Sequence, residues 1–300
     1  MSNTLQTLTI SPNGPVFDLP LYVARDEGLF ARAGLEIAFQ ARYQDRAPSE
    51  KDAFARLKEQ LFEQGKADVY NLCEWAGIDR SERSTRGSQI LALRPAVAAQ
   101  AIISFDIDIQ EPRDLAGVPI GINQLTGSHY TTLQLLEGAI PRDQIIVEHA
   151  GSPENRYKAL RDGKYRAVTV MEPFISLALK EGAHLVDVTF YRGAEVITPT
   201  LSDEKRKGYI AAINAASDLI NSDFGRFKHY ILAHVGDIGA TLKPEDLGRQ
   251  FIRYTHVRPF EAERFRYTYE WMQSWGLTEG ASTHEKIVAP ALTPPAIVAA

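Results

Sequence analysis

Three side chains that could take part in nucleophilic or acid–base chemistry lie in two short segments of the sequence. Cys73, the single cysteine of the chain, is followed directly by Glu74, and His129 lies in a second polar segment. A thiolate is a nucleophile, a buried carboxyl group can donate a proton, and imidazole titrates near neutral pH. We therefore take Cys73, Glu74 and His129 as candidate catalytic residues. The structural alternatives are an inert packed thiol, a charge at a helix start and a histidine that caps its own helix.

Each of these segments follows an expected strand. Apolar runs at residues 67–71 and 118–122 predict strands, and the second leads into a helix expected over residues 130–138. The chain opens in the same order, with a strand over residues 5–11, a Pro- and Gly-rich loop, and a helix over residues 19–33. In open α/β sheets, ligands bind at the carboxyl ends of the strands. The sequence therefore predicts a ligand site where these loops meet.

Four loops in such positions, together with one arginine, carry the polar and aromatic residues that we expect to bind a ligand. The candidate ligand-binding residues are Asn13, Phe17 and Asp18 in the first loop, Tyr70, Asn71 and Trp75 in the second, Asn123, Thr126, Gly127, Ser128 and Tyr130 in the third, Glu172 and Phe174 in the fourth, and Arg192 after the last expected strand of the second series.

The third loop has the clearest physical mechanism for binding an anion. It opens a helix, so the backbone N–H groups of Gly127, Ser128 and His129 have no partner within the helix and lie at the positive end of its dipole. A carboxylate, sulfonate or phosphate suits such a position. The alternative is that Thr126 or Ser128 only caps the helix.

The other candidates also have structural alternatives. The aromatic residues would give the site walls that suit a flat organic ligand, but aromatic side chains at sheet ends also form the core. Glu172 could donate a proton if it is buried near the ligand, or it could be only a charge at a helix start. Arg192 could hold a carboxylate with two hydrogen bonds, or it could be solvated.

Several segments carry a resemblance to a known family. The run PLYVARDEGLFARAGLEI, at residues 20–37, resembles the opening of the type II periplasmic-binding-protein superfamily. Further matches follow in family order: FEQGKADV at residues 62–69, PRDLAGVPIG at 112–121, and KALRDG at 158–163 followed by AVTVMEPF at 167–174. The branch that they resemble contains nitrate, sulfonate and taurine carriers and the thiamine-pyrimidine synthases.

This resemblance implies an α/β, two-lobed type II periplasmic-binding-protein-like fold with the ligand cleft between the lobes. We expect residues 1–97 and 199–300 to form the first lobe, including C-terminal helices, and residues 98–198 to form the second. A desulfinase of this fold uses a cysteine in the first loop, where this chain has Asn13, Gly14 and Phe17. Its catalytic role therefore does not carry over to Cys73.

Composition limits the partners. A formal net charge of −5 over 300 residues argues against nucleic acid as a partner, and no apolar run approaches the roughly 20 residues that span a bilayer. The first residues show no export signal, so we expect a cytoplasmic protein. One cysteine and the spacing of the seven histidines predict no metal site, and we expect no cofactor.

Two functions remain open. The first is a cytoplasmic enzyme, a lyase or hydrolase of the decarboxylase or desulfinase type, acting on a small organic acid that is aromatic or unsaturated. The second is a non-catalytic binder, either the substrate-binding protein of an ABC importer for nitrate, sulfonate or taurine or an intracellular sensor. An ABC permease would be a partner only if the protein is exported. The sequence favours the enzyme by a narrow margin, because no export signal is apparent.

Overall fold

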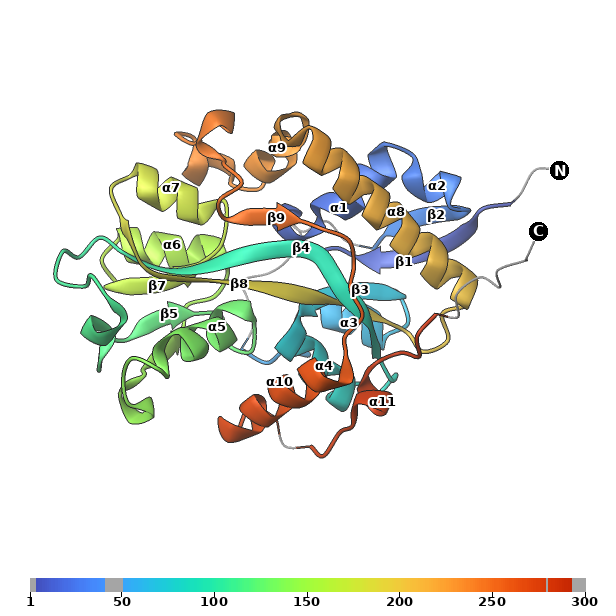
Figure 1. The fold of residues 1–300 in the computed structure, drawn as a ribbon. Helices are drawn as coiled ribbons and strands as arrows, with labels where there is room; N and C mark the ends of the chain where they lie inside the picture. Colours follow the sequence, from blue (N-terminus) through green and yellow to red (C-terminus); the bar gives the residue numbers. More distant parts are fainter. Residues whose placement is uncertain (1–3, 41–50, 279, 293–300) are drawn as a thin grey trace.

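The computed structural model describes residues 4–40, 51–278 and 280–292, which form one nine-stranded sheet with helices around it (Figure 1). The strands are β1 (Gln6–Ser11), β2 (Leu35–Phe39), β3 (Val69–Cys73), β4 (Gln89–Ser104), β5 (Ile120–Ile122), β6 (Val147–His149), β7 (Ala167–Val170), β8 (His184–Ile197) and β9 (Ile252–Tyr254). The helices are α1 (Pro15–Asp26), α2 (Leu29–Arg32), α3 (Leu57–Glu63), α4 (Glu74–Arg83), α5 (Gly127–Leu136), α6 (Pro153–Arg161), α7 (Phe174–Lys180), α8 (Asp203–Ser222), α9 (Phe224–Ala233), α10 (Ala262–Ser274) and α11 (His284–Ile287).

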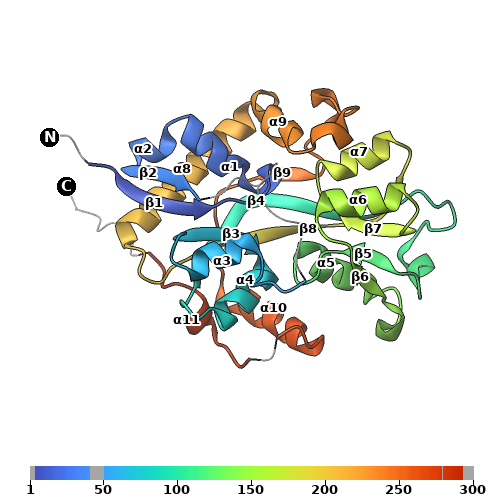
Figure 2. The same ribbon diagram turned by 180° about the vertical axis from the view of Figure 1, so that it is seen from behind.

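The strand order divides the sheet into two halves. It runs β2-β1-β3-β8-β4-β7-β5-β6, and β9 pairs with β4 outside this path. Strands β1, β2 and β3 are parallel to one another, as are β5, β6 and β7, which matches the alternation of strands and helices in the sequence. We call the half around β1–β3 the first lobe and the half around β5–β7 the second lobe. Figure 2 shows the two groups on opposite sides of the molecule.

Two long antiparallel strands join the lobes. One end of β4 pairs with β8 from Gln89, and its other end pairs with both β8 and β7 near Ile103. Taken alone, the apolar runs at residues 88–93, 101–104 and 185–188 predict three short strands. Instead β4 and β8 each run through the junction, with register shifts near Leu93 and Val97 that bend the ladder. The lobe limits at residues 98 and 198 stay a prediction.

The first strand–helix unit forms because its loop cannot continue a strand. Gly14 precedes α1, and Pro15 occupies the first helical position, where the missing N–H costs nothing. The helix buries one face, including Val16, Leu19 and Val23, and α1 packs against α8 and β4. Asn13, Phe17 and Asp18 are thereby held at the carboxyl end of β1.

The C-terminal part returns to the first lobe. Helix α8 packs on α1, α2 and β2, and α10 and α11 pack on α4. The sequence of residues 244–254 by itself predicts a helix, and this prediction is wrong: a short helical turn, Pro244–Asp246, is followed by the extended strand β9, which pairs with β4. The edge of β4 offered unpaired backbone groups, and pairing with them outweighed local propensity.

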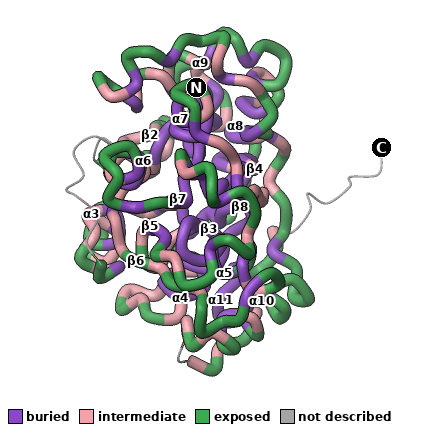
Figure 3. Tube along the Cα trace, turned by 90° about the vertical axis from the view of Figure 1, so that its left-hand side faces the viewer, coloured by how far each residue is buried: buried purple, intermediate pink, exposed green. Residues whose placement is uncertain are grey.

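The sheet is the most buried layer. Figure 3 shows strands β3, β4, β7 and β8 largely buried along the middle of the molecule, with exposed residues on the outer helices and loops. The larger hydrophobic cluster extends through both lobes. A smaller cluster around Ile120 and Leu136 lies in the second lobe alone.

Candidate functional site

The second and third loops meet where the lobes adjoin. Arg56, one residue before α3, donates a 2.6 Å hydrogen bond to the carbonyl of Gln124, and Arg80 of α4 donates one of 2.9 Å to the carbonyl of Leu125. The rings of Trp75 and Tyr130 stack with their centres 5.6 Å apart. The predicted convergence of these two loops is therefore present in the structure.

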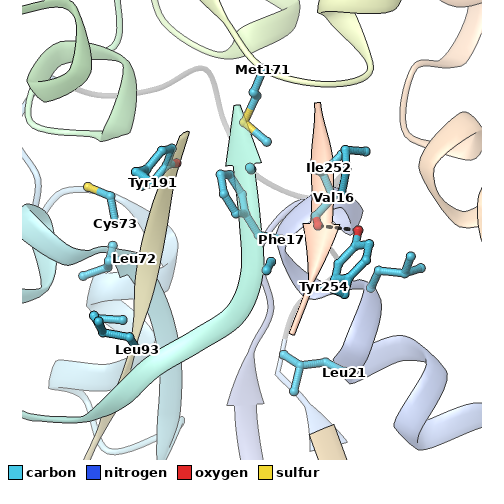
Figure 4. Close-up of a cluster of buried hydrophobic side chains, with 14 of the residues drawn as sticks. Val16, Phe17, Leu21, Leu72, Cys73, Leu93, Met171, Tyr191, Ile252 and Tyr254 are labelled. Carbon is cyan, nitrogen blue, oxygen red and sulfur yellow. Dashed lines mark hydrogen bonds between the residues drawn. The ribbon is translucent and has the colours of Figure 1, made fainter. Parts of the chain in front are cut away.

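Tyr191 of β8 joins the first loop to the other two. Its ring centre lies 5.7 Å from that of Phe17 and 5.6 Å from that of Trp75. A Cβ placed on Gly127 would lie 2.6 Å from the Tyr191 hydroxyl oxygen, so only glycine allows this approach. Figure 4 shows Phe17, Cys73, Tyr191 and Met171 gathered from four different segments. We call Phe17, Trp75, Tyr130 and Tyr191 the aromatic cluster.

The first turn of α5 leaves two backbone amides unpaired. Thr126 does not cap the helix, because its hydroxyl donates to the carbonyl of Asn123 at 2.8 Å. The Ser128 hydroxyl accepts instead from the Asn123 amide at 2.9 Å. Within the described part of the chain, the N–H groups of Gly127 and Ser128 have no hydrogen-bond acceptor. An oxyanion could occupy this position.

Several buried polar atoms of this region also lack hydrogen-bond partners among the described residues, the Tyr130 hydroxyl among them. The indole nitrogen of Trp75, whose side chain is 3% exposed, has no acceptor, and neither has Gln100 Oε1 a donor. The Gln100 amide nitrogen would lie 3.3 Å from a Cβ on Gly127, so Gln100 belongs to the same region. A buried unpaired donor is costly, which favours a ligand or water at Trp75.

Cys73 and Glu74 lie at the start of α4 and are both buried. Burial raises the pKa of the Cys73 thiol to about 12, although Arg80 and Lys58 act in the opposite direction. Burial also raises the pKa of Glu74, and Arg264 partly offsets this through hydrogen bonds of 2.6 and 3.0 Å to one carboxylate oxygen. The thiol is thus not activated, and the carboxylate is already paired.

His129 supports the backbone of its own loop. Its Nδ1 accepts a 3.3 Å hydrogen bond from the amide of Leu125, a residue in the left-handed region with φ 54°. Burial lowers the pKa of His129 to about 4, so the ring is neutral at physiological pH. No hydrogen bond joins Cys73, Glu74 and His129 to one another in the described residues.

Asp18 and Asn71 are engaged in a buried network rather than left available to a ligand. Asp18 Oδ1 accepts from Asn71 and from Arg94, each at 2.6 Å, and its other oxygen accepts from the Asn13 amide. Arg94 also donates to Asn71 Oδ1 at 2.8 Å and lies 3.3 Å from Glu195. These predicted ligand residues therefore fix the first loop to the sheet.

The remaining candidates lie outside the aromatic cluster. Tyr70 packs on Phe62, with ring centres 4.7 Å apart, and Phe174 packs on Tyr157 at 5.8 Å. Glu172 accepts from the Ser176 amide at 3.0 Å and from its hydroxyl at 2.6 Å, and thereby serves the first turn of α7.

Arg192 donates to the carbonyl of Arg94 at 3.1 Å. Its guanidinium contacts the backbone near the junction, and among the described residues it donates no hydrogen bond to a carboxylate. Burial and the nearby Arg258 and Arg264 lower its pKa.

Sequence analysis missed five residues of this region: Arg56, Arg80, Arg94, Gln100 and Tyr191. Tyr191 and Gln100 lie in the parts of β8 and β4 that were not expected to be strand. Extending the alternation of β8 beyond residue 188 would have placed Tyr191 at the junction. Nothing in the local pattern distinguishes the three arginines from solvated ones.

The space between the lobes is filled by side chains. Two surface hollows, of about 330 and 510 Å³, lie elsewhere, beside Tyr165 and beside Gly208. Because the Trp75 ring packs on both Tyr130 and Tyr191, a ligand that enters here must displace these rings.

Over residues 4–40, 51–278 and 280–292, no three His, Cys, Asp or Glu side chains come together in a way that could hold a metal ion. The helices in this part of the chain all fall short of the length and apolar character that a bilayer crossing requires.

Neither the protein-family models nor the curated proteins contain a match to this chain. Solved structures do match. The alkanesulfonate-binding protein SsuA of Xanthomonas axonopodis pv. citri, bound to MOPS, has a TM-score of 0.69 and 14% identity, over 94% of this chain and 96% of that one. The periplasmic aliphatic sulphonate-binding protein SsuA of Escherichia coli has a TM-score of 0.74 and 14% identity, over 94% and 97%.

The desulfurization enzyme DSZB is also similar, with a TM-score of 0.63 and 15% identity over 96% of this chain and 97% of that one. A mutant of that enzyme has been solved in complex with biphenyl-2-sulfinic acid. The chain thus has the two-lobed periplasmic-binding-protein-like fold, as its sequence motifs predicted. Within this fold, the solved neighbours include both binding proteins and an enzyme.

Proposed function

We propose that the protein binds a small organic oxyanion between its lobes and does not transform it. The observation that carries this proposal is the pair of unpartnered amides, of Gly127 and Ser128, at the first turn of α5 beside the aromatic cluster. Amides at a helix start favour a carboxylate, sulfinate or sulfonate group, and the aromatic cluster suits the apolar part of the same molecule.

Two arginines hold the third loop in place. Arg56 and Arg80 donate to the carbonyl groups of Gln124 and Leu125. Arg80 is also paired with Asp79 at 2.5 Å and lies 3.5 Å from Glu59, so its charge is balanced within the protein. In our proposal the anion is therefore bound by the backbone amides and not by these arginines.

The three candidate catalytic residues favour binding over catalysis. Cys73 is a buried thiol with a raised pKa, Glu74 is paired with Arg264, and His129 is neutral and occupied by a backbone amide. A general acid or nucleophile needs a free, suitably ionised group near the substrate. The predicted lyase or hydrolase activity is therefore the alternative that the experiment has to test.

The names of the solved neighbours support the same ligand class, because two are sulfonate-binding proteins and one has been solved with a sulfinic acid. An ABC permease would be a partner of this chain only if the protein is exported, and its cytoplasmic location stays a prediction.

Calorimetric titration tests the proposal. The ligands are benzenesulfonate, benzoate and ethanesulfonate, with inorganic sulfate as the ion that lacks an apolar part. We expect at least one organic anion to bind more tightly than sulfate, without turnover in mass spectrometry after long incubation. Trp75→Phe removes the indole N–H but keeps a ring, and should weaken binding about tenfold or more, as for a lost hydrogen bond to a charged group.

Tyr267→Phe is the matched control, because Tyr267 is 58% exposed and should leave affinity unchanged. Circular dichroism verifies that each variant is folded. Absence of binding to all three organic anions would contradict the proposed ligand class. Conversion of any of them would support the lyase or hydrolase alternative and contradict a purely binding role.

A further inference from the structure

One carboxylate in the second lobe accepts hydrogen bonds from two tryptophans at the end of α10. Glu137 follows α5 directly, and its two oxygens accept from the indole nitrogens of Trp271 and Trp275, at 2.7 and 2.8 Å. Trp271 lies in the last turn of α10, and Trp275 directly follows its last residue, Ser274. Each oxygen of Glu137 thus has its own donor.

Arg142 contacts both Glu137 and the Trp275 ring. Its guanidinium lies 3.2 Å from Glu137 and 4.3 Å from the centre of the Trp275 ring. It also donates to the carbonyl of Ser274 at 2.7 Å and to its hydroxyl at 3.1 Å. Together, Glu137, Arg142, Trp271, Ser274 and Trp275 form what we call the clasp.

The same helix, α10, also contacts the first lobe. Arg264, near the start of α10, pairs with Glu74 of α4 at 2.6 Å, and the Trp271 ring lies 6.3 Å from that of Trp75. Helix α10 packs on α4, and α5 contacts β5 and β7 of the second lobe as well as α4 and the crossing strands β4 and β8. Helix α10 therefore bridges the two lobes (Figure 1).

We propose that the clasp is an interlobe latch and that Glu137 is its key positioning residue. With the latch made, the side of α5 is tied to α10, and Trp75 is held between Trp271 and Tyr130. Opening the lobes requires both indole hydrogen bonds to break. The Glu137 side chain is 26% exposed, so water can replace these bonds and opening stays reversible.

This inference rests on the proposed function in one respect, because the lobes must separate to admit a ligand past Trp75. The existence of the latch is independent of any ligand, however. The test is therefore made on the ligand-free protein.

Glu137→Gln is the sharpest variant. Glutamine has the same shape but only one acceptor oxygen, and its NH₂ group would face the second indole N–H. We expect amide hydrogen exchange in residues 127–144 and 262–276 to become about tenfold faster, the factor that corresponds to one lost hydrogen bond to a charged group. All three tryptophans of the chain lie at this junction, so their emission should shift to longer wavelength.

Trp275→Phe is the second variant, because it keeps a ring over Arg142 but removes one N–H. It should speed exchange in the same two segments, and combination with Glu137→Gln should add less than the sum of the two effects. Glu154→Gln is the control, since Glu154 is a 46% exposed carboxylate that pairs with Lys158 on α6. It should change neither exchange nor emission.

The latch is overturned if Glu137→Gln and Trp275→Phe, both folded by circular dichroism, leave exchange in these segments within twofold of the unaltered protein. It is also overturned if exchange rises equally across the whole chain, which would indicate global destabilisation. The ligand titration is a separate readout. Faster exchange without any ligand binding would support the latch and contradict the proposed function alone.

Discussion

Burial changes the acidity of two residues in opposite directions. It raises the pKa of Glu172 from 4.5 to about 7 and lowers the pKa of His129 from 6.5 to about 4. Ser176 donates to both oxygens of Glu172, which offsets part of the effect of burial on that carboxyl, and the Leu125 amide donates to the neutral ring of His129. Each residue therefore links the stability of the fold to pH, with opposite sign.

The raised pKa of Glu172 means that the folded state binds its proton more tightly. Its contribution to stability is fully present below pH 4.5 and is lost as the pH rises through 7, by about 3 kcal/mol in total. The contribution of His129 is fully present above pH 6.5 and is lost as the pH falls through 4, by a similar amount. In the unaltered protein, the loss of stability that Glu172 causes with rising pH and the gain that His129 causes largely cancel between pH 5 and 6.5.

We expect Glu172→Gln and His129→Asn to separate the two slopes. In Glu172→Gln, which lacks the titrating carboxyl, the free energy of unfolding should rise more steeply with pH than in the unaltered protein. In His129→Asn, the asparagine can still accept from the Leu125 amide but does not titrate. The free energy of unfolding of this variant should therefore fall more steeply with pH than in the unaltered protein. Urea unfolding at pH 5, 6 and 7 measures both, and parallel curves for all three proteins would contradict the argument.

At the scale of elements, the packing of α8 depends on a small residue. Gly208 lies inside this 20-residue helix, where α8 passes over α2 and β2. A Cβ at Gly208 would lie 2.8 Å from the carbonyl oxygen of Ala33 and 3.2 Å from Leu35. The close approach of the helix to this backbone therefore requires glycine.

Gly208→Ala should destabilise the protein by about 1–3 kcal/mol, as overpacking does. At a solvent-exposed position of a helix, the same change would stabilise the protein by about 1 kcal/mol. The sign of the change in stability therefore shows whether Gly208 is tightly packed. Gly138→Ala is the control, because nothing lies within 4 Å of its Cβ position, and its effect should stay within about 0.5 kcal/mol. Denaturant unfolding measures both, and a more stable Gly208→Ala protein would mean that α8 does not pack as described.

At the scale of the whole molecule, one buried arginine connects four elements. Arg94 of β4 is 1% exposed and contacts Asp18 of α1, Asn71 of β3 and Glu195 of β8. Tyr209 of α8 extends the network by donating to Glu195 at 2.8 Å. The network therefore ties the first loop and α8 to the two strands that cross between the lobes.

Arg94→Met should destabilise the protein by about 3–5 kcal/mol, because it leaves two buried carboxylates without their counter-charge. Adding Glu195→Gln to this variant should recover part of the loss. Arg166→Met removes a surface pair with Asp106, in which the arginine is 51% exposed, and should cost less than about 1 kcal/mol. Thermal and denaturant unfolding compare the variants, and equal losses for Arg94→Met and Arg166→Met would refute the role of the network.

The sequence by itself determined the class of fold and the neighbourhood of the site. Strand and helix periodicity, with stop signals such as Gly34, are local properties, and they predicted the parallel units around β1–β3 and β5–β7. The rule that ligands bind at strand ends then placed Phe17, Trp75, Gly127 and Tyr130 in loops that the structure brings to one junction.

Only the tertiary structure decided which polar groups remain available at that junction. Asp18 and Asn71 looked like ligand contacts, yet they serve Arg94, which is 76 residues away from Asp18 in the sequence. Tyr191 and Gln100 became part of the site because β8 and β4 continue through the junction. A local pattern predicts backbone conformation, but partners for buried charges and amides are chosen among distant residues, by packing and by the cost of leaving a polar group unpaired.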